Sequence, residues 1–240
     1  MSTEIIMSYS SSGKVLSSRG INTVSPLSNY SWWRKQTTSC SPDQLTEIII
    51  APRGMYEIPS DAFNEVYPGI IIGDGTTALC VMRLKSLGVT HVLNAACGKD
   101  PAFGLINTSR NFYQASGIRF LGIEAYDMSS FCLSPHFREA ADFIQSALDC
   151  RGKVYVHCKM GISRSATLVL AYLMIKKGMT AQEAVRTVRS RRQIIPNDGF
   201  LKQLCQLNED LIQKKAIEER RERLMSSYSS SGPTSRVTVI

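Results

Sequence analysis

The residues with the clearest capacity for chemistry lie in one short loop between Cys158 and Arg164. The preceding segment, 153–156, is rich in β-branched and aromatic residues, which is typical of a short buried strand. The following segment, 166–176, is a long apolar run of good helix formers and indicates a buried helix. A turn from a strand into a helix directs backbone N–H groups and the positive end of a helix dipole to one point. We therefore expect an anion-binding site at this loop.

The side chains of the loop suit a nucleophile that works on an anion. A thiol at a helix N-terminus, here Cys158, is shifted toward its thiolate. Gly161 allows the loop to curl with its amides pointing inward, and Arg164 can bind two phosphate oxygens at once. His157 is placed to stabilise the loop and the thiolate, and Ser165 can donate a hydrogen bond to the thiolate when it leaves. The combination predicts phosphoryl transfer and argues against an inert buried cysteine.

Composition sets broad limits on the protein class. With 240 residues, of which 43% are hydrophobic, the chain suits one globular domain with tails. It has no apolar run long enough for a membrane span and no signal-peptide pattern at its start, so we expect a cytoplasmic or nuclear location. Seven scattered cysteines without a CxxC pair argue against a disulfide framework and a structural zinc site. A net charge of +8 fits nucleic acid, anionic lipid or a phosphorylated partner and does not choose among them.

The pattern along the chain predicts an α/β domain between two tails. Residues 1–40 are serine-rich and are predicted to be disordered; residues 41–213 form the catalytic domain; residues 214–240 form a charged helical extension that ends in a disordered, serine-rich tail from about 226. Within the domain, strands alternate with helices, which is typical of a mostly parallel sheet. Besides the segments around the loop, we expect strands at 65–67, 70–72, 90–94 and 119–125, and helices at 41–51, 76–87, 134–148, 180–191 and 196–213.

Hydrolysis of a phosphoester also needs a general acid to protonate the leaving oxygen. Asp127 is the leading candidate because it lies on a polar loop just beyond the strand at 119–125. Glu124 is the competing choice, but it lies within the strand itself. The alternative role for Asp127 is that of a solvated turn residue.

The loop sequence His-Cys-Lys-Met-Gly-Ile-Ser-Arg-Ser at 157–165 resembles the His-Cys-x-x-Gly-x-x-Arg-Ser signature of the protein tyrosine phosphatase superfamily. Val-Leu-Asn-Ala-Ala at 92–96 and Pro-Asn-Asp-Gly-Phe at 196–200 look like the small atypical dual-specificity phosphatases of the VHR type. The resemblance covers about residues 42–213. It implies a central, mostly parallel, twisted sheet flanked by helices, and it places the family's general acid at Asp127.

The resemblance also implies a two-step mechanism. The Cys158 thiolate attacks phosphorus, and Asp127 first protonates the leaving oxygen and then activates water, while Ser165 eases departure of the thiolate. The substrate phosphate would be bound by the loop, with contributions from His157, Lys159, Met160, Gly161, Ile162, Ser163 and Arg164. No metal or other cofactor is required, since Arg164 and the loop dipoles supply the positive charge.

The family pattern bears on the substrate as well. Lys159 and Arg192 match basic residues that favour a second phosphate, which suits a doubly phosphorylated Thr-x-Tyr segment such as a MAP kinase activation loop. Arg189 and Arg191 either join this basic rim or lie on a solvated helix face. Met160 and Ile162 stand where VHR-like loops have Glu and Tyr, which puts the selectivity for tyrosine over threonine in question.

Three other functions share parts of these features. A phosphatase for RNA ends or for lipids would use the same loop, but RNA would favour a longer basic face than the sequence provides. A non-catalytic scaffold that binds phosphoproteins would be marked by loss of the cysteine or the acid, and both are present. A rhodanese-like sulfur transferase also uses a cysteine loop but would not need the acid. We therefore expect phosphorylated proteins, and no nucleic acid, as partners.

Overall fold

The computed structural model describes residues 39–51 and 53–230. Residues 1–38 and 231–240, both predicted to be tails, lie outside the described residues.

A five-stranded sheet forms the centre of the domain, with strand order β1-β2-β5-β3-β4. Its strands are β1 Phe63–Tyr67, β2 Ile70–Gly73, β3 Val89–Asn94, β4 Arg119–Gly122 and β5 Lys153–His157. Only β1 is antiparallel to its neighbour, so the prediction of a mostly parallel sheet is confirmed. Because β5 is the middle strand, the loop that follows it lies at the centre of the edge where the parallel strands end. Ligand sites of open α/β sheets lie at this edge.

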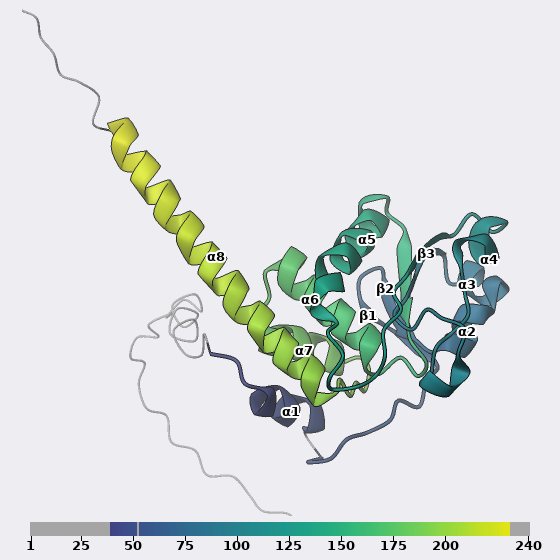
Figure 1. The fold of residues 1–240 in the computed structure, drawn as a ribbon. Helices are drawn as coiled ribbons and strands as arrows, with labels where there is room; N and C mark the ends of the chain where they lie inside the picture. Colours follow the sequence, from purple (N-terminus) through teal and green to yellow (C-terminus); the bar gives the residue numbers. More distant parts are fainter. Residues whose placement is uncertain (1–38, 52, 231–240) are drawn as a thin grey trace, which may run out of the picture. The chain divides into compact units, whose positions relative to one another are not determined.

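Two hydrophobic cores cover the two faces of the sheet. Ile70 and Ile72 point into the larger core, whereas Ile71 points into the smaller one, as the alternation of side chains along a strand requires. The larger core is closed by α1 Pro42–Ile50, α5 Phe137–Asp149, α6 Arg164–Lys177, α7 Ala181–Arg189 and α8 Asp198–Ser230. The smaller core is closed by α2 Gly75–Leu79, α3 Val81–Ser86 and α4 Arg110–Gln114 (Figure 1). The 3₁₀ helices η2 Pro101–Phe103 and η3 Ser134–His136 complete the fold.

The helix after the loop is enclosed by its neighbours. Every residue of α6 from Arg164 to Met174 is buried, because α5, α7, α8 and the sheet surround the helix. This explains why the predicted helix is apolar on all sides instead of on one stripe. The rigid setting of α6 in turn fixes the loop that forms its N-terminus.

The predicted starts of two helices, at 41 and at 180, are confirmed. Ser41 and Gln44 form a capping box at α1, and Thr180 and Glu183 form one at α7. In each box the side chains satisfy two amides that the first turn of a helix leaves without a partner.

Other predictions need correction. The helix predicted over 76–87 is broken at Cys80 into α2 and α3. The Tyr113 hydroxyl donates to the Ala78 carbonyl, at 2.8 Å, and so occupies the acceptor that a continuous helix would offer to the amide of Met82. The strand predicted over 119–125 ends at Gly122. Residues 98–117, where the sequence analysis expected no helix or strand, contain η2 and α4.

The last helix is longer than expected. The charged extension is helical, and α8 continues to Ser230, into the segment predicted to be disordered. Good helix formers and an i,i+4 pair between Glu219 and Arg223, at 3.7 Å, favour this extension. Among the described residues, no helix combines the length and apolarity needed to cross a membrane.

Candidate active site

Hydrogen bonds hold every backbone carbonyl of the loop from its outer side. The donors lie on β5, on α2, on the segment after α7 and in α6. The acceptor–donor pairs are Cys158 with His157 Nδ1 (3.3 Å), Lys159 with Gly75 N (3.1 Å), Met160 with Arg192 Nη2 (3.1 Å), Gly161 with Arg192 Nε (2.8 Å), Ile162 with Ile195 N (2.7 Å) and Ser163 with Thr167 N (2.8 Å). With the carbonyls held outside, the loop amides are left to face its centre, as an anion-binding nest requires.

Gly161 is required at its position for two reasons. Its φ angle of 69° lies in the left-handed region. A Cβ atom would also lie 2.4 Å from the carbonyl oxygen of Gly73 at the end of β2. The loop can therefore pack against the sheet edge only with glycine here.

Cys158 lies at the base of the loop and is only 1% exposed. Its Sγ is 3.3 Å from Ser165 Oγ. Burial alone would raise the pKa of the Cys158 thiol, but the Arg164 charge and hydrogen bonds from Ser165 and Gly161 outweigh it, so the pKa is lowered. A buried thiolate that positive charge and N–H donors stabilise is a prepared nucleophile.

His157 has a more limited role than the sequence predicted. It is fully buried, and burial lowers the pKa of its imidazole to about 4, so the ring is neutral near pH 7. Since a carbonyl can only accept, Nδ1 carries the proton and donates to the Cys158 carbonyl. His157 therefore stabilises the loop by a neutral hydrogen bond. It adds no positive charge beside the thiolate, and it is not among the residues that line the pocket.

Arg164 is buried, and its guanidinium group is fixed by two backbone carbonyls. Nη1 donates to Ala125 O at 3.0 Å and to Gly104 O at 3.3 Å, and Nη2 donates to Gly104 O at 3.3 Å. Nε has no hydrogen-bond acceptor among the described residues and lies 3.5 Å from Asp127 Oδ2. The Nε–H and the second Nη2–H share one edge of the guanidinium plane. This edge can bind two oxygens of one phosphate.

Asp127 is brought to the loop from the segment after β4. Its Oδ1 accepts hydrogen bonds from Ser163 Oγ at 2.7 Å and from Asn197 Nδ2 at 2.9 Å. Its side chain is 34% exposed, so it can exchange protons with water. Glu124, the competing acid, points elsewhere and accepts from the Tyr126 hydroxyl at 2.9 Å. Asn197 also contacts the site. The sequence analysis used it in a helix start and in the family resemblance at 196–200 but did not assign it to the site.

Cys158, Arg164 and Asp127 surround one pocket of about 270 Å³. The other residues that line it are Ala102, Phe103, Gly104, Lys159, Met160 and Ile162. Exposed apolar side chains stand at its mouth, with Phe103 58% and Met160 45% exposed. The wall at 102–104 was missed by the sequence analysis, because nothing in a polar loop indicates that its backbone reaches Arg164.

Arg192 does not occupy the predicted substrate-facing position. Its side chain is 1% exposed, and its guanidinium donates to the carbonyls of Met160 and Gly161, to Asp61 O and to Asn64 Oδ1. Arg189 likewise faces the protein, where it binds Ile49 O and Glu57. Of the four cations proposed for a basic rim, only Lys159 lines the pocket. The prediction that Arg192 reads a second phosphate is therefore wrong: its donors already hold the outer side of the loop.

The sequence profile described as "Dual specificity phosphatase, catalytic domain" matches residues 70–210, more than half of the chain. The chain belongs to the dual-specificity phosphatase family. The crystal structure of human DUSP28 is similar, with 28% identity, coverage of 65% of this chain and 99% of that one, and a TM-score of 0.55. A mouse putative dual specificity phosphatase complexed with zinc tungstate is also 28% identical, with 69% and 97% coverage and a TM-score of 0.55.

The structure of PTPMT1 in complex with PI(5)P shares the fold at 22% identity, with 65% and 99% coverage and a TM-score of 0.56. These comparisons confirm the resemblance to dual-specificity phosphatases without singling out the VHR type. They also match the α/β architecture with its mostly parallel sheet.

The buried position of Arg192 predicts a defect that does not depend on a second phosphate. Replacement Arg192→Lys keeps the charge but cannot reproduce four hydrogen bonds in their present directions. We expect kcat/KM to fall by about tenfold or more on a singly phosphorylated peptide, since unsatisfied buried acceptors disorder the loop. The exposed neighbour Arg191→Lys, measured in parallel, should change it by less than about twofold. A defect confined to doubly phosphorylated peptides would contradict this role.

The lowered pKa of Cys158 predicts a specific pH dependence of alkylation. Below the ordinary thiol pKa, Cys158 should react with iodoacetamide faster than a free thiol, because more of it is thiolate. Arg164→Met removes the charge that opposes burial, so the Cys158 pKa should rise and the alkylation profile should move to higher pH. Peptide mapping gives the rate at each cysteine, and the rate at exposed Cys150 should stay unchanged. An unshifted Cys158 profile in Arg164→Met would contradict the assignment of cause.

Proposed function

We propose that the protein is a cysteine-dependent protein phosphatase that hydrolyses phosphotyrosine and phosphoserine or phosphothreonine through a phosphocysteine intermediate. The convergence of Cys158, Arg164 and Asp127 on one pocket carries this proposal. Each group comes with the environment that its role needs: a lowered thiol pKa, a guanidinium whose Nε has no hydrogen-bond acceptor among the described residues, and an acid with access to water.

In the first step the Cys158 thiolate attacks phosphorus, and the bond from phosphorus to the substrate oxygen breaks. The amides of the loop and the Nε edge of Arg164 bind the phosphate oxygens and stabilise the charge that they carry in the transition state. Asp127 transfers its proton to the leaving oxygen, so the product departs as a neutral phenol or alcohol.

In the second step Asp127, now a carboxylate, takes a proton from water as the water attacks the phosphocysteine. The sulfur–phosphorus bond breaks, and inorganic phosphate forms. Ser165 Oγ, 3.3 Å from Sγ, can donate its proton in a hydrogen bond to the returning thiolate. The cycle consumes one water and needs no redox partner.

The pocket favours a phosphate on a protein side chain over a phosphate within a polyanion. The exposed apolar residues at its mouth, Phe103 and Met160, offer contact area to the ring of phosphotyrosine or to apolar neighbours in a peptide. The proposed substrates include a doubly phosphorylated MAP kinase segment. Its second phosphate has support from Lys159 alone, since Arg192 is buried.

Phosphate release from a panel of substrates tests the proposal. The panel contains a Thr-x-Tyr peptide phosphorylated on both residues, the same peptide phosphorylated on either one, an RNA 5′-triphosphate and a phosphoinositide. We expect release from the peptides, loss of release in Cys158→Ser and a fall of about 10²- to 10⁴-fold in Asp127→Asn. Glu124→Gln is the matched control and should keep its activity, since that acid faces Tyr126.

The same panel separates the alternatives. Preference for the phosphoinositide or the RNA would show that the substrate is a lipid or a nucleic acid and not a protein. Tight binding of phosphopeptide by the wild-type protein without release would assign the chain to phosphoprotein-binding scaffolds. Release that survives Cys158→Ser would exclude the phosphocysteine route.

A further inference from the structure

The start of α8 holds the loop that carries the proposed general acid. We call residues 125–134 the acid loop. We propose that Gln203 is a positioning residue for the reaction, because it holds the far end of the acid loop and so keeps Asp127 in the pocket. This inference rests on the phosphatase function proposed above, and it concerns a residue outside the pocket.

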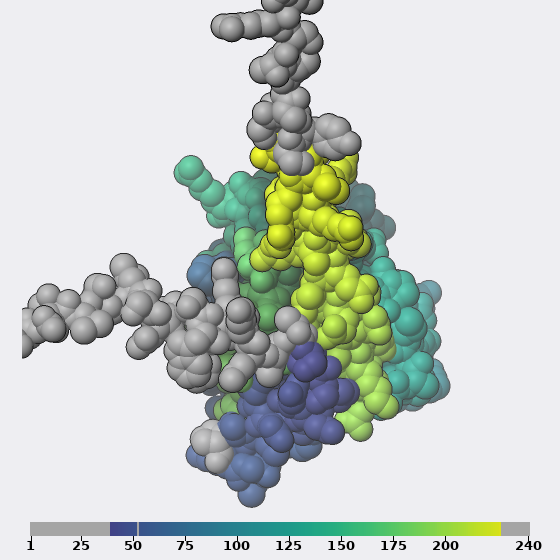
Figure 2. Space-filling model, turned by 90° about the vertical axis from the view of Figure 1, so that its left-hand side faces the viewer, coloured from purple at the N-terminus to yellow at the C-terminus, as the bar shows by residue number. Residues whose placement is uncertain are grey.

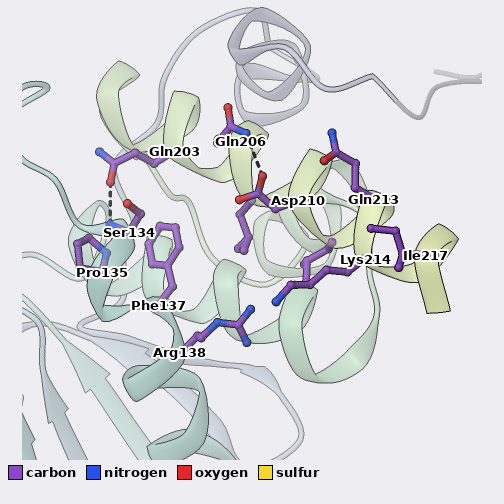
Figure 3. A pocket seen from close by; sticks show the side chains of 12 residues that line it. Ser134, Pro135, Phe137, Arg138, Gln203, Gln206, Asp210, Gln213, Lys214 and Ile217 are labelled. Atoms are coloured by element: carbon purple, nitrogen blue, oxygen red, sulfur yellow. Dashed lines mark hydrogen bonds between the residues drawn. The ribbon is translucent and has the colours of Figure 1, made fainter.

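The Gln203 amide makes three hydrogen bonds, all to the backbone of the acid loop. Its Oε1 accepts from Leu133 N at 2.7 Å and from Ser134 N at 2.8 Å, and its Nε2 donates to Phe131 O at 2.8 Å. Figure 3 shows the side chain reaching from α8 to Ser134. The two ends of one amide thus bind both kinds of backbone group, which fixes its orientation as well as its position.

The acid loop needs such a partner because its end is also the start of η3. The first amides of a helix have no partner within the helix, and the residue before η3, Leu133, provides no side-chain cap. The side chain of Leu133 is buried, so its amide has little access to water. Gln203 supplies from α8 the cap that the local sequence lacks.

Contacts within the loop connect this end to Asp127. Phe131 N donates to Met128 O and Met128 N donates to Tyr126 O, each at 3.0 Å. The rings of Tyr126 and Phe131 are 5.9 Å apart. The loop is therefore a folded unit and not an open chain, so a shift at Phe131 moves the residues on both sides of Asp127.

Two further residues, one just before α8 and one in its first turn, also contact the acid loop. Asn197 donates to Asp127 itself. Gly199 packs so closely that a Cβ atom there would lie 1.9 Å from Ser129 O. Asn197, Gly199 and Gln203 thus contact the beginning, middle and end of the loop. Misplacement of a catalytic group by about 1 Å can cost about 10²-fold in rate.

Two substrates with different leaving groups distinguish a positioning role of Gln203 from a merely structural one. Gln203→Met keeps the size of the side chain but loses the hydrogen bonds. We expect kcat for phenyl phosphate, whose leaving group needs a proton, to fall by about tenfold or more. With a dinitrophenyl phosphate, whose leaving group departs as a stable anion, the fall should stay below about twofold. The basic limb of the phenyl phosphate pH profile should flatten as well.

The matched control is Gln206→Met. Gln206 lines the same groove of α8 as Gln203, but its amide binds Asp210 within the helix, at 3.0 Å (Figure 3). It should leave both rates unchanged. Equal loss on both substrates in Gln203→Met, or no loss, would overturn the positioning role. Failure of the wild-type protein to hydrolyse the dinitrophenyl ester in a Cys158-dependent way would overturn the proposed function and the positioning role with it.

A separate observation concerns two cysteines far from the pocket. Cys40 precedes α1, and Cys205 lies on α8, where the two helices are side by side (Figure 2). Their sulfur atoms are 2.6 Å apart although both are free thiols. Cys205 is nearly buried, whereas Cys40 is partly exposed and open to a small oxidant. A hydrogen bond from Cys205 also lowers the pKa of Cys40, which favours the nucleophilic thiolate.

We infer that Cys40 and Cys205 are a site of oxidative modification by hydrogen peroxide. The Cys40 thiolate takes one oxygen from peroxide to give a sulfenic acid, and Cys205 displaces water from it. Overall, two thiols and one peroxide give one disulfide and two waters. The bond would tether the segment before α1 to α8, across 165 positions of sequence.

Peptide mapping under non-reducing conditions tests this site. The full chain with Cys158→Ser, treated with peroxide, should give a Cys40–Cys205 peptide that a dithiol reductant removes. The exposed thiols Cys132 and Cys150 are internal controls and should stay outside the cross-link. Cys40→Ser should abolish the cross-linked peptide. Oxidation of Cys40 without the cross-link, or pairing of Cys205 with another cysteine, would overturn the inference.

Discussion

The site depends on one constraint: the carbonyls of the loop from Cys158 to Ser163 must be satisfied from outside it. A peptide unit has its N–H and C=O on opposite sides, so holding the carbonyls outward presents the amides inward. The donors come from four parts of the chain, including Gly75 of α2 and Ile195 after α7. The anion site is therefore a product of the whole fold, although its sequence signature spans only a few residues.

Asp127, the other part of the site, is positioned by different contacts. Asp127 follows an edge strand and lies on a loop without regular structure, so its position has to come from contacts that other elements provide. Ser163 provides one from within the loop after β5. The others come from Asn197, just before α8, and from Gly199 and Gln203 on α8. Because Ser163 belongs to one half and binds the other, the nucleophile and the acid share a fixed geometry. The start of α8 packs in the larger core and also contacts the loop of Asp127, so it links the packing of that core to the position of the proposed general acid.

The sequence predicted correctly those features that depend only on a few neighbouring residues. The strand, the loop, the buried helix α6 and the starts of α1 and α7 follow from patterns over a few neighbouring positions. The predictions were wrong where a contact with a residue distant in the sequence determines the local structure. A buried arginine and an exposed one look the same in sequence, so Arg192 was predicted at the rim. The break at Cys80 depends on Tyr113, and the pocket wall at Gly104 depends on Arg164, both remote in the chain.

The correction at Arg192 changes how the pocket can choose its substrate. A rim with several free cations would select by the number of phosphates. Here the pocket lining carries only Lys159 and Arg164 as cations, and the proposed mechanism uses Arg164 for the first phosphate. The net charge of +8 is therefore a poor guide to this site. Selectivity has to come mainly from shape and apolar contact at the mouth, where Phe103 and Met160 are exposed. Binding through apolar contact depends only weakly on ionic strength, whereas binding to a charged rim depends on it strongly. The preference among substrates should therefore be largely insensitive to salt. Binding of the phosphate group itself should still weaken as salt is added.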